Sequence, residues 1–177
     1  MIKVCSGKYR SRILQTPDEG TLPTKNRVRE AIFSALSTYI PGANVLDLFA
    51  GSGALGIEAL SRGAKFATFV DKNPKAAAIV RANLSTLKET NAKVMAEDYI
   101  SALDSFREPF DVVFLDPPYA MKDSYQMAID YLLEYELLSE ESAVMVEYEG
   151  ELTLNTQAFS SRRDYTYGKT KVIILKK

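Results

Sequence analysis

Four consecutive residues, Asp116-Pro117-Pro118-Tyr119, have the chemistry needed to bind a planar amine. Each proline holds φ near about −65° and lacks an N–H, so the backbone before it stays extended and its carbonyl oxygens remain free acceptors. A carboxylate and such carbonyls accept the N–H groups of an amine, and a tyrosine ring stacks on a flat ring system. We therefore predict that Asp116, Pro117, Pro118 and Tyr119 are catalytic residues that act on an amino group.

A glycine-rich segment at 47–56, Asp-Leu-Phe-Ala-Gly-Ser-Gly-Ala-Leu-Gly, is the second candidate site. It lies between an expected strand and an expected helix, where glycines permit a tight turn and the close approach of a ligand to the backbone. Asp71 ends the next expected strand, 18 residues after Gly53, near the spacing of a carboxylate that binds a ribose. Asp98 ends the third, where it could accept a hydrogen bond from an adenine amine. One such carboxylate alone often only caps a helix, but the set predicts a nucleoside cofactor.

The residue types that are absent exclude several chemistries. The chain has no histidine, which excludes Ser-His-Asp and Cys-His pairs and histidine zinc sites, and we expect no metal. Cys5 is the single cysteine, so there is no internal disulfide. No apolar run approaches the roughly 20 residues of a membrane span, and the first residues lack the apolar core of a signal peptide. The sequence therefore predicts a cytoplasmic protein with no membrane partner, and its catalysis must use carboxylates, hydroxyls, amides or backbone groups.

The elements that must position these residues alternate between strand and helix after Pro41-Gly42. Apolar runs predict strands at 45–49, 66–71, 93–97, 112–115 and 143–147. The patterns between them predict helices at 54–61, 74–87, 100–106 and 124–134. The entirely apolar segment 112–115 is typical of a strand buried on both faces of a parallel sheet. Together they predict a Rossmann-like, doubly wound α/β fold with a mostly parallel sheet.

The two ends of the chain depart from this alternation. Residues 165–175 predict an antiparallel hairpin that closes one edge of the sheet. Residues 1–15 predict a small β-hairpin, and a helix is expected from Pro23. We therefore divide the chain into an N-terminal extension at 1–40 and one compact α/β unit at 41–177, and we expect a monomer. A chain of 177 residues buries about 70% of its unfolded surface and needs no covalent staple.

The charge of the chain is unevenly distributed, although the net charge is only −1. Residues 1–30 carry seven Lys and Arg against three acidic residues, and residues 162–177 carry six against one. The region between them is strongly acidic. Two basic ends on one face would suit a nucleic-acid backbone, and an acidic body would suit a cationic small molecule.

The order of these motifs resembles a known enzyme family. Segment 47–53, Asp71 and segment 116–119 resemble the class I S-adenosylmethionine-dependent methyltransferases that modify exocyclic amino groups. Segments 7–12 and 27–33, with the final segment 167–171, resemble the RsmD family, which methylates guanine N2 in bacterial small-subunit ribosomal RNA. The sequence departs from the family at Ser11, where a glycine is common, and at Leu22, where an arginine is common.

The resemblance implies S-adenosylmethionine as the cofactor and residues 41–177 as the methyltransferase domain. Asp47 and the backbone of Gly51 to Gly53 would hold its methionine end, Asp71 its ribose and Asp98 its adenine amine. The cofactor-binding residues implied are Asp47, Phe49, Ala50, Gly51, Ser52, Gly53, Asp71 and Asp98. The acidic body fits this cofactor, because a sulfonium and an ammonium are easier to desolvate beside carboxylates.

The resemblance also implies ribosomal RNA as the partner, within an assembly intermediate of the small subunit. Lys25, Arg27 and Arg29 lie in the first turns of the expected helix, where cations oppose the helix dipole, which favours an anionic partner. The predicted RNA-binding residues are Lys8, Arg10, Arg12, Lys25, Arg27, Arg29 and Lys122.

Three alternatives remain open at the level of the sequence. The segment Asp116 to Tyr119 does not by itself separate guanine N2 from adenine N6, so a DNA or RNA adenine-N6 methyltransferase is the first. An NAD-dependent oxidoreductase would share the glycine loop and Asp71 but does not need the amine site. A non-catalytic RNA-binding assembly factor that retains the cofactor fold is the third.

Overall fold

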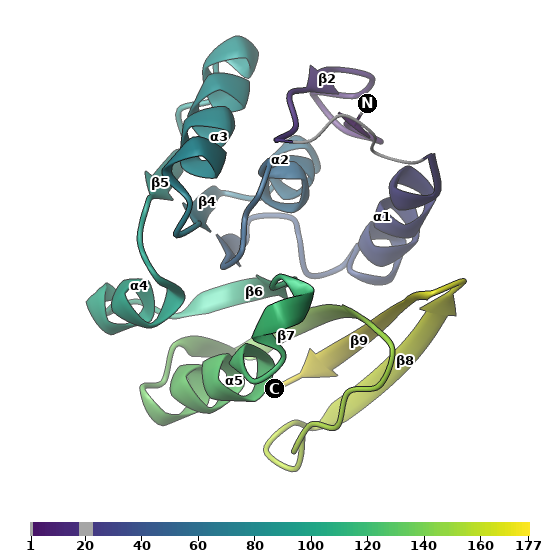
Figure 1. Cartoon of the computed structure of the whole chain (residues 1–177), viewed down its shortest axis with the longest axis vertical. Coiled ribbons are helices and arrows are strands. Elements are labelled where there is room, and N and C mark those ends of the chain that lie inside the picture. The colour runs from purple at the N-terminus through teal and green to yellow at the C-terminus, as the bar shows by residue number, and fades with distance from the viewer. Residues whose placement is uncertain (1, 18–22) are drawn as a thin grey trace.

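The computed structural model of the chain describes residues 2–17 and 23–177 (Figure 1). The departure from the family pattern at Leu22 lies outside the described residues. Within the described part, no helix has the length and apolar character that a membrane crossing requires.

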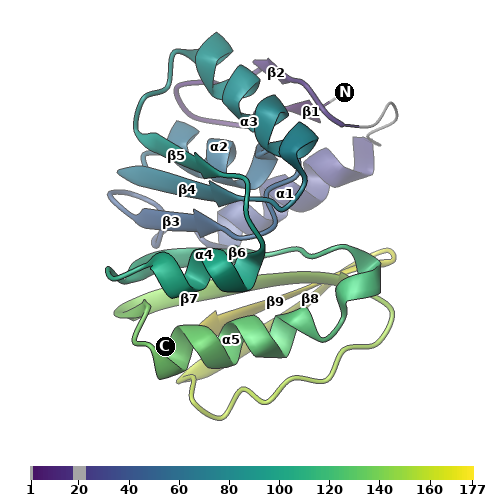
Figure 2. The same ribbon diagram turned by 60° about the vertical axis from the view of Figure 1, so that its left-hand side comes forward.

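A seven-stranded sheet runs through the middle of the molecule (Figure 2). Its strands, in spatial order, are β5 (Ala92–Met95), β4 (Phe66–Val70), β3 (Asn44–Asp47), β6 (Phe110–Leu115), β7 (Leu138–Glu149), β9 (Thr170–Lys176) and β8 (Ser161–Tyr167). The first five are parallel, and β9 pairs antiparallel with both β7 and β8. The predicted doubly wound sheet with an antiparallel C-terminal hairpin is therefore confirmed.

Helices cover both faces of this sheet. The elements are α1 (Pro23–Ala35), α2 (Ala54–Ser61), α3 (Pro74–Leu87), α4 (Tyr99–Ser105), the short 3-10 helix η1 (Tyr119–Met121) and α5 (Ser124–Glu134). Helices α1, α2 and α3 pack with one buried cluster, and α4 and α5 pack with the other. Successive strand residues alternate between the two clusters, as Val112 and Val113 do, because side chains of a strand point to opposite faces.

Local signals explain where several helices begin and end. Asn73 accepts a hydrogen bond from Lys75 N at 2.9 Å, and Pro74 occupies the first helical position, where a missing N–H costs nothing. Helices α2, α3 and α5 have the predicted bounds. Strands β3 and β5 end two residues before the prediction, at Asp47 and Met95, because the following residues turn into loops at the sheet edge.

The N-terminal extension shares a hydrophobic core with the rest of the chain. Strand β1 (Ile2–Lys3) pairs antiparallel with β2 (Ile13–Leu14), which agrees with the predicted hairpin. The buried Ile2, Val4 and Leu14 join α1, α2 and the sheet in one cluster. The extension therefore packs against the α/β unit through this shared core.

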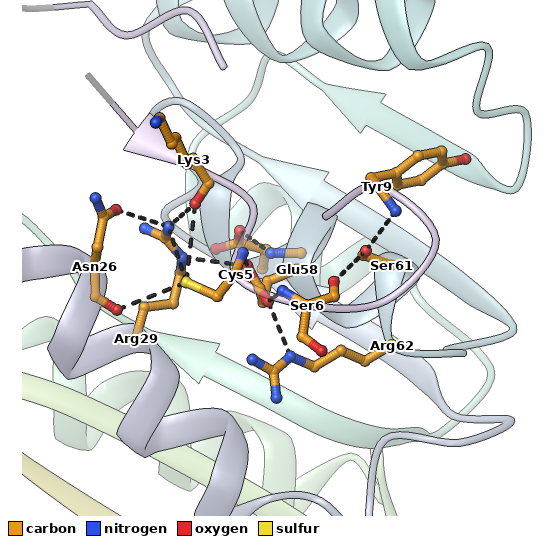
Figure 3. A network of polar contacts seen from close by, with 11 residues as sticks. Lys3, Cys5, Ser6, Tyr9, Asn26, Arg29, Glu58, Ser61 and Arg62 are labelled. Atoms are coloured by element: carbon orange, nitrogen blue, oxygen red, sulfur yellow. Dashed lines mark hydrogen bonds and ion pairs between the residues drawn. The ribbon is translucent and has the colours of Figure 1, made fainter. Parts of the chain in front are cut away.

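A buried carboxylate on α2, that of Glu58, connects this helix to the N-terminal extension (Figure 3). Glu58 is fully buried and accepts hydrogen bonds from Cys5 N at 2.9 Å and Ser6 N at 3.0 Å. It also forms ion pairs with Arg62 at 2.9 Å and Arg29 at 3.4 Å. Four donors thus satisfy a charge that would be very costly to bury alone.

Candidate active site

The carboxyl ends of the parallel strands meet at one edge of the sheet, and a cavity of about 560 Å³ opens there. Ligands of open α/β sheets bind at this edge. The predicted catalytic and cofactor-binding residues that line the cavity are Phe49, Ala50, Gly51, Ser52, Asp71, Asp98, Asp116, Pro117 and Pro118, and two residues predicted to bind RNA, Lys25 and Arg29, line it as well. The structure thus brings together predicted catalytic and cofactor-binding residues that are up to 69 positions apart, from Phe49 to Pro118.

Asp71 is fixed beneath the glycine loop. One carboxylate oxygen, Oδ2, accepts a hydrogen bond from Gly51 N at 2.9 Å, and the other, Oδ1, accepts one from Asn73 N at 2.9 Å. A carboxylate has about four acceptor positions, so the two oxygens retain capacity for the hydroxyl groups of a ligand. Asp71 can therefore orient the loop and bind a diol at the same time.

Asp47 and Gly53 lie behind the loop and do not line the cavity. Asp47 is 1% exposed, and its Oδ2 accepts a hydrogen bond from Gly56 N at 3.0 Å. Burial, with a smaller effect from the charge of Asp71, raises the pKa of Asp47 to about 7. Gly53 has φ +80° and faces Val80. Both residues shape the turn that presents the loop, and their predicted contact with the cofactor stays a prediction.

Asp98 both lines the cavity and begins a helix. Its Oδ1 accepts a hydrogen bond from Ile100 N at 2.9 Å and caps α4. The cap leaves the second oxygen without a bond in that turn, so capping and ligand binding are compatible. The rings of Phe49 and Tyr99, 5.2 Å apart, form an aromatic pair beside Asp98.

The segment from Asp116 to Tyr119 joins this cavity to a second one of about 270 Å³. Both cavities are lined by Lys25, Asp116, Pro117 and Glu147. Tyr119 lines only the smaller cavity and is 83% exposed, which leaves its ring free to stack on a base. The junction at Asp116 and Pro117 is where a group bound in one cavity can meet a group bound in the other.

The electrostatics of the junction favour proton acceptance by Asp116. Asp116 is exposed to solvent and borders both cavities. Partial desolvation by the surrounding protein, followed by the nearby charges of Glu147 and Asp47, raises the pKa of Asp116. The charge of Lys25 acts in the opposite direction.

Glu147 is not among the residues predicted from the sequence, and Lys25 is predicted there only to bind RNA. A signal for Glu147 was present, because it ends the predicted strand 143–147, and the rule that ligands bind at strand ends applies to that strand as well. Lys25 enters the junction from α1, and its proximity to Asp116 depends on how α1 packs, which no local pattern encodes.

The predicted RNA-binding residues have different surroundings. Arg10 and Arg27 are exposed, and Lys122 is exposed beside the smaller cavity. Lys8 forms an ion pair with Glu89 at 2.8 Å. The exposed Arg12 donates a hydrogen bond to the carbonyl oxygen of Thr86 at 3.3 Å. These side chains are accessible to an anion, although two of them already have partners.

Arg29 is a correction to the prediction. Its side chain is almost fully buried, and it donates hydrogen bonds to the carbonyl oxygen of Lys3 and to Asn26 Oδ1, beside its ion pair with Glu58 (Figure 3). The guanidinium is occupied in holding the extension to α2. It therefore does not contribute to an RNA-binding surface.

A family model and several relatives of known name place the chain in the same family. A family model described as conserved hypothetical protein 95 matches residues 2–176. Ribosomal RNA small subunit methyltransferase D of Escherichia coli is 40% identical over 156 residues, which cover 88% of this chain and 78% of the relative. The protein of the same name from Haemophilus influenzae is 40% identical over 163 residues, covering 88% and 82%.

Two solved structures are also similar. That of yhhF from Escherichia coli, a proposed methyltransferase, superposes with a TM-score of 0.89 at 36% identity and covers 99% of this chain and 97% of its own. The Thermus thermophilus 16S rRNA N2 G1207 methyltransferase RsmC, in complex with AdoMet and guanosine, has a TM-score of 0.72 at 20% identity. It covers 91% of this chain and 44% of its own, and this likeness concerns the fold alone.

The sheet, the glycine loop and the strand-end carboxylates are those of a class I S-adenosylmethionine-dependent methyltransferase. The cavity is consistent with this cofactor, because its volume lies within the usual range for ligand sites and Asp71, Glu97 and Asp98 give it an acidic lining. The chain belongs to the RsmD family, as the resemblance implied. Within the described residues, no group of three or more His, Cys, Asp or Glu is arranged to hold a metal ion.

Proposed function

We propose that the protein methylates the exocyclic N2 amine of a guanine in bacterial 16S ribosomal RNA. The observation that carries the proposal is the junction at Asp116 and Pro117, between an acidic cavity and a smaller one bordered by the exposed ring of Tyr119. The printed names of the relatives support ribosomal RNA as the substrate class.

The larger cavity would hold the cofactor through residues of three strand ends. The backbone of Gly51 and Ser52 would contact its methionine end, Asp71 its ribose hydroxyls, and Asp98 its adenine amine. When bound, S-adenosylmethionine supplies a methyl group activated by the positive sulfur. Phe49 and Ala50 would border the adenosine.

The residues at the junction would position the amine. Its nitrogen lone pair is delocalised into the guanine ring, which makes it a weak nucleophile. By accepting both N–H groups, Asp116 and the carbonyl of Pro117 would draw the amine out of conjugation and direct its lone pair. Tyr119 would stack on a base that has left its helix, with Pro118 fixing the turn between them.

Asp116 would also receive the proton. The amine loses a proton only as its nitrogen gains the methyl group, and the raised pKa of Asp116 makes its carboxylate a better acceptor than an ordinary aspartate. No histidine base is needed for this chemistry.

The RNA backbone would be held by exposed cations around the site, with Lys25 and Lys122 nearest the target base. Lys8, Arg10, Arg12 and Arg27 would extend the contact along the N-terminal extension. We further propose that the protein acts as a monomer in the cytoplasm, on an assembly intermediate of the small subunit.

The test is to identify the product. Labelled S-adenosylmethionine is supplied with small subunits, or with naked 16S RNA, from a strain that lacks the gene, and the nucleosides are analysed by mass spectrometry. We expect N2-methylguanosine. N6-methyladenosine would overturn the proposal in favour of the adenine alternative, and no transfer despite tight cofactor binding would favour a non-catalytic assembly factor.

A further inference from the structure

Glu147 lines both cavities but has no role in the chemistry proposed above. Leu115 of β6 is the register partner of Val146 of β7, so Asp116, directly after the end of β6, and Glu147 of β7 occupy corresponding positions. Adjacent strands are about 4.8 Å apart. Both residues line both cavities, so two carboxylates lie together at the junction.

Glu147 is held in place by its backbone and not by its carboxylate. The hydroxyl of Tyr125 donates to the carbonyl oxygen of Glu147 at 2.7 Å, and β9 pairs with it at Val172. Among the residues whose side chains the structure describes, none forms a hydrogen bond or a close ion pair with the Glu147 carboxylate. Lys25 and Arg29 stabilise its charge from a greater distance, against burial and the charge of Glu149. Its acceptor capacity is therefore available to a ligand.

Two adjacent carboxylates match the donor pattern of guanine. The edge of guanine carries two neighbouring donors, N1–H and the N2 amine, whereas N1 of adenine is an acceptor. If Asp116 accepts from the amine, a second acceptor beside it faces the N1 position. A carboxylate there attracts guanine and repels adenine, because two lone pairs would face each other.

We propose that Glu147 is the residue that selects guanine, by accepting a hydrogen bond from N1–H of the target base. The proposal rests on the proposed function, since it assigns the base specificity of the same site. A site built to pair with a donor discriminates strongly against an analogue that lacks it, because the buried acceptor is left unpaired.

The test uses 2-aminopurine, which keeps the 2-amino group but has no N1–H. The mapped target guanosine is replaced by 2-aminopurine in 16S RNA assembled from ligated fragments, and kcat/KM is measured for both RNAs. For the unmodified enzyme we expect a preference for guanosine of at least about 100-fold. Nearly equal kcat/KM values for the two RNAs would overturn the role of N1–H recognition. They would not affect the separate proposal that the enzyme methylates N2.

The Glu147→Gln variant then tests the residue. Its amide can donate to N1 of 2-aminopurine, so we expect the preference for guanosine to fall by at least about tenfold. Glu140→Gln removes an exposed carboxylate near the opposite end of β7, outside the lining of both cavities, and should leave the preference unchanged. An unchanged preference in Glu147→Gln, with cofactor affinity retained as proof of folding, would overturn the proposal. Failure of the unmodified enzyme to form N2-methylguanosine would instead refute the proposed function.

Discussion

We propose that Asp116 and Tyr119 act on the base, so changing them should affect turnover more than cofactor binding. We expect Asp116→Ala and Tyr119→Ala each to lower kcat at least about tenfold, since a hydrogen bond to a charged group contributes about 1.5–3 kcal/mol and base stacking about 1–3 kcal/mol. Calorimetric titration with S-adenosylmethionine should give nearly the parent affinity. Asp71→Ala is the matched control, because it should weaken cofactor binding directly. Normal turnover in either of the first two variants would reject the assigned role.

Asp47 gives a prediction about stability and pH. Its pKa is raised to about 7 in the folded protein, whereas an unfolded aspartate titrates near about 3.9. The folded state binds the extra proton between these values, so the stability that Asp47 contributes is complete below about pH 4 and is lost as pH rises through about 7. Asp47→Asn keeps an acceptor for Gly56 N–H and does not titrate.

We therefore expect the free energy of unfolding of Asp47→Asn to rise relative to the parent as pH increases from about 4 to about 7. Urea unfolding of both proteins across this range measures the difference, and groups common to both proteins cancel. A difference that stays constant with pH would contradict the raised pKa of Asp47.

At the scale of residues, the sequence predicted the cavity lining well, because the strand-end rule locates Asp71, Asp98 and Asp116 without any tertiary information. It did not predict that Asp47 faces α2, since the side to which a strand residue points depends on the packed sheet. Arg29 could have been recognised as buried. It precedes Ile32 by three residues and Phe33 by four, on the apolar face of α1.

At the scale of elements, α2 depends on a close approach to β4. A Cβ placed on Gly56 would lie 2.3 Å from Phe69 Cε1, which is inside any normal contact distance. Phe69 is fully buried and has no room to move. We expect Gly56→Ala to lower the free energy of unfolding by about 1–3 kcal/mol and to weaken cofactor binding, because α2 carries the end of the glycine loop.

Denaturant unfolding checks this value. Ala78→Ser is the control, because it adds one heavy atom at an exposed position of α3 and should change stability by less than about 0.5 kcal/mol. Equal free energies of unfolding for Gly56→Ala and the parent would mean that α2 can move away from β4 without loss of stability, which would contradict the prediction.

The extent of β7 could not be predicted, although its centre could. After Leu138, the polar residues 139–142 at its beginning have no strand pattern of their own. They are extended because β7 continues past a register shift opposite Phe110 and Val112, and because β9 pairs along its second half. Pairing between distant segments determines both ends of β7, whereas α3, which Asn73 caps, has the predicted bounds.

At the scale of the whole molecule, the exposed cations of the N-terminal extension are expected to set the salt dependence of RNA binding. Arg27→Glu should weaken RNA binding and reduce the magnitude of the slope of log affinity against log salt by about one unit or more. Each phosphate contact that is lost lowers the number of counterions released on binding. Filter binding to 16S RNA at several salt concentrations measures the slope.

Lys65→Glu is the control for this experiment. Lys65 is exposed at the amino end of β4, whereas the site lies at the carboxyl ends of the strands. Its reversal makes the same change in net charge but should leave the slope close to the parent value. Equal slopes for the two variants would show that Arg27 acts only through the overall charge.

The ring of donors around Glu58 has a consequence for chimeric proteins. An N-terminal extension transplanted from a relative would have to supply Arg29 and two suitably placed backbone N–H groups, or it would leave a buried carboxylate poorly compensated. Breaking a buried ion pair on one side costs about 3–5 kcal/mol. The extension and α2 should therefore be transplanted together. A chimera that exchanges the extension between family members should keep Glu58, Arg29 and Arg62 from the same parent.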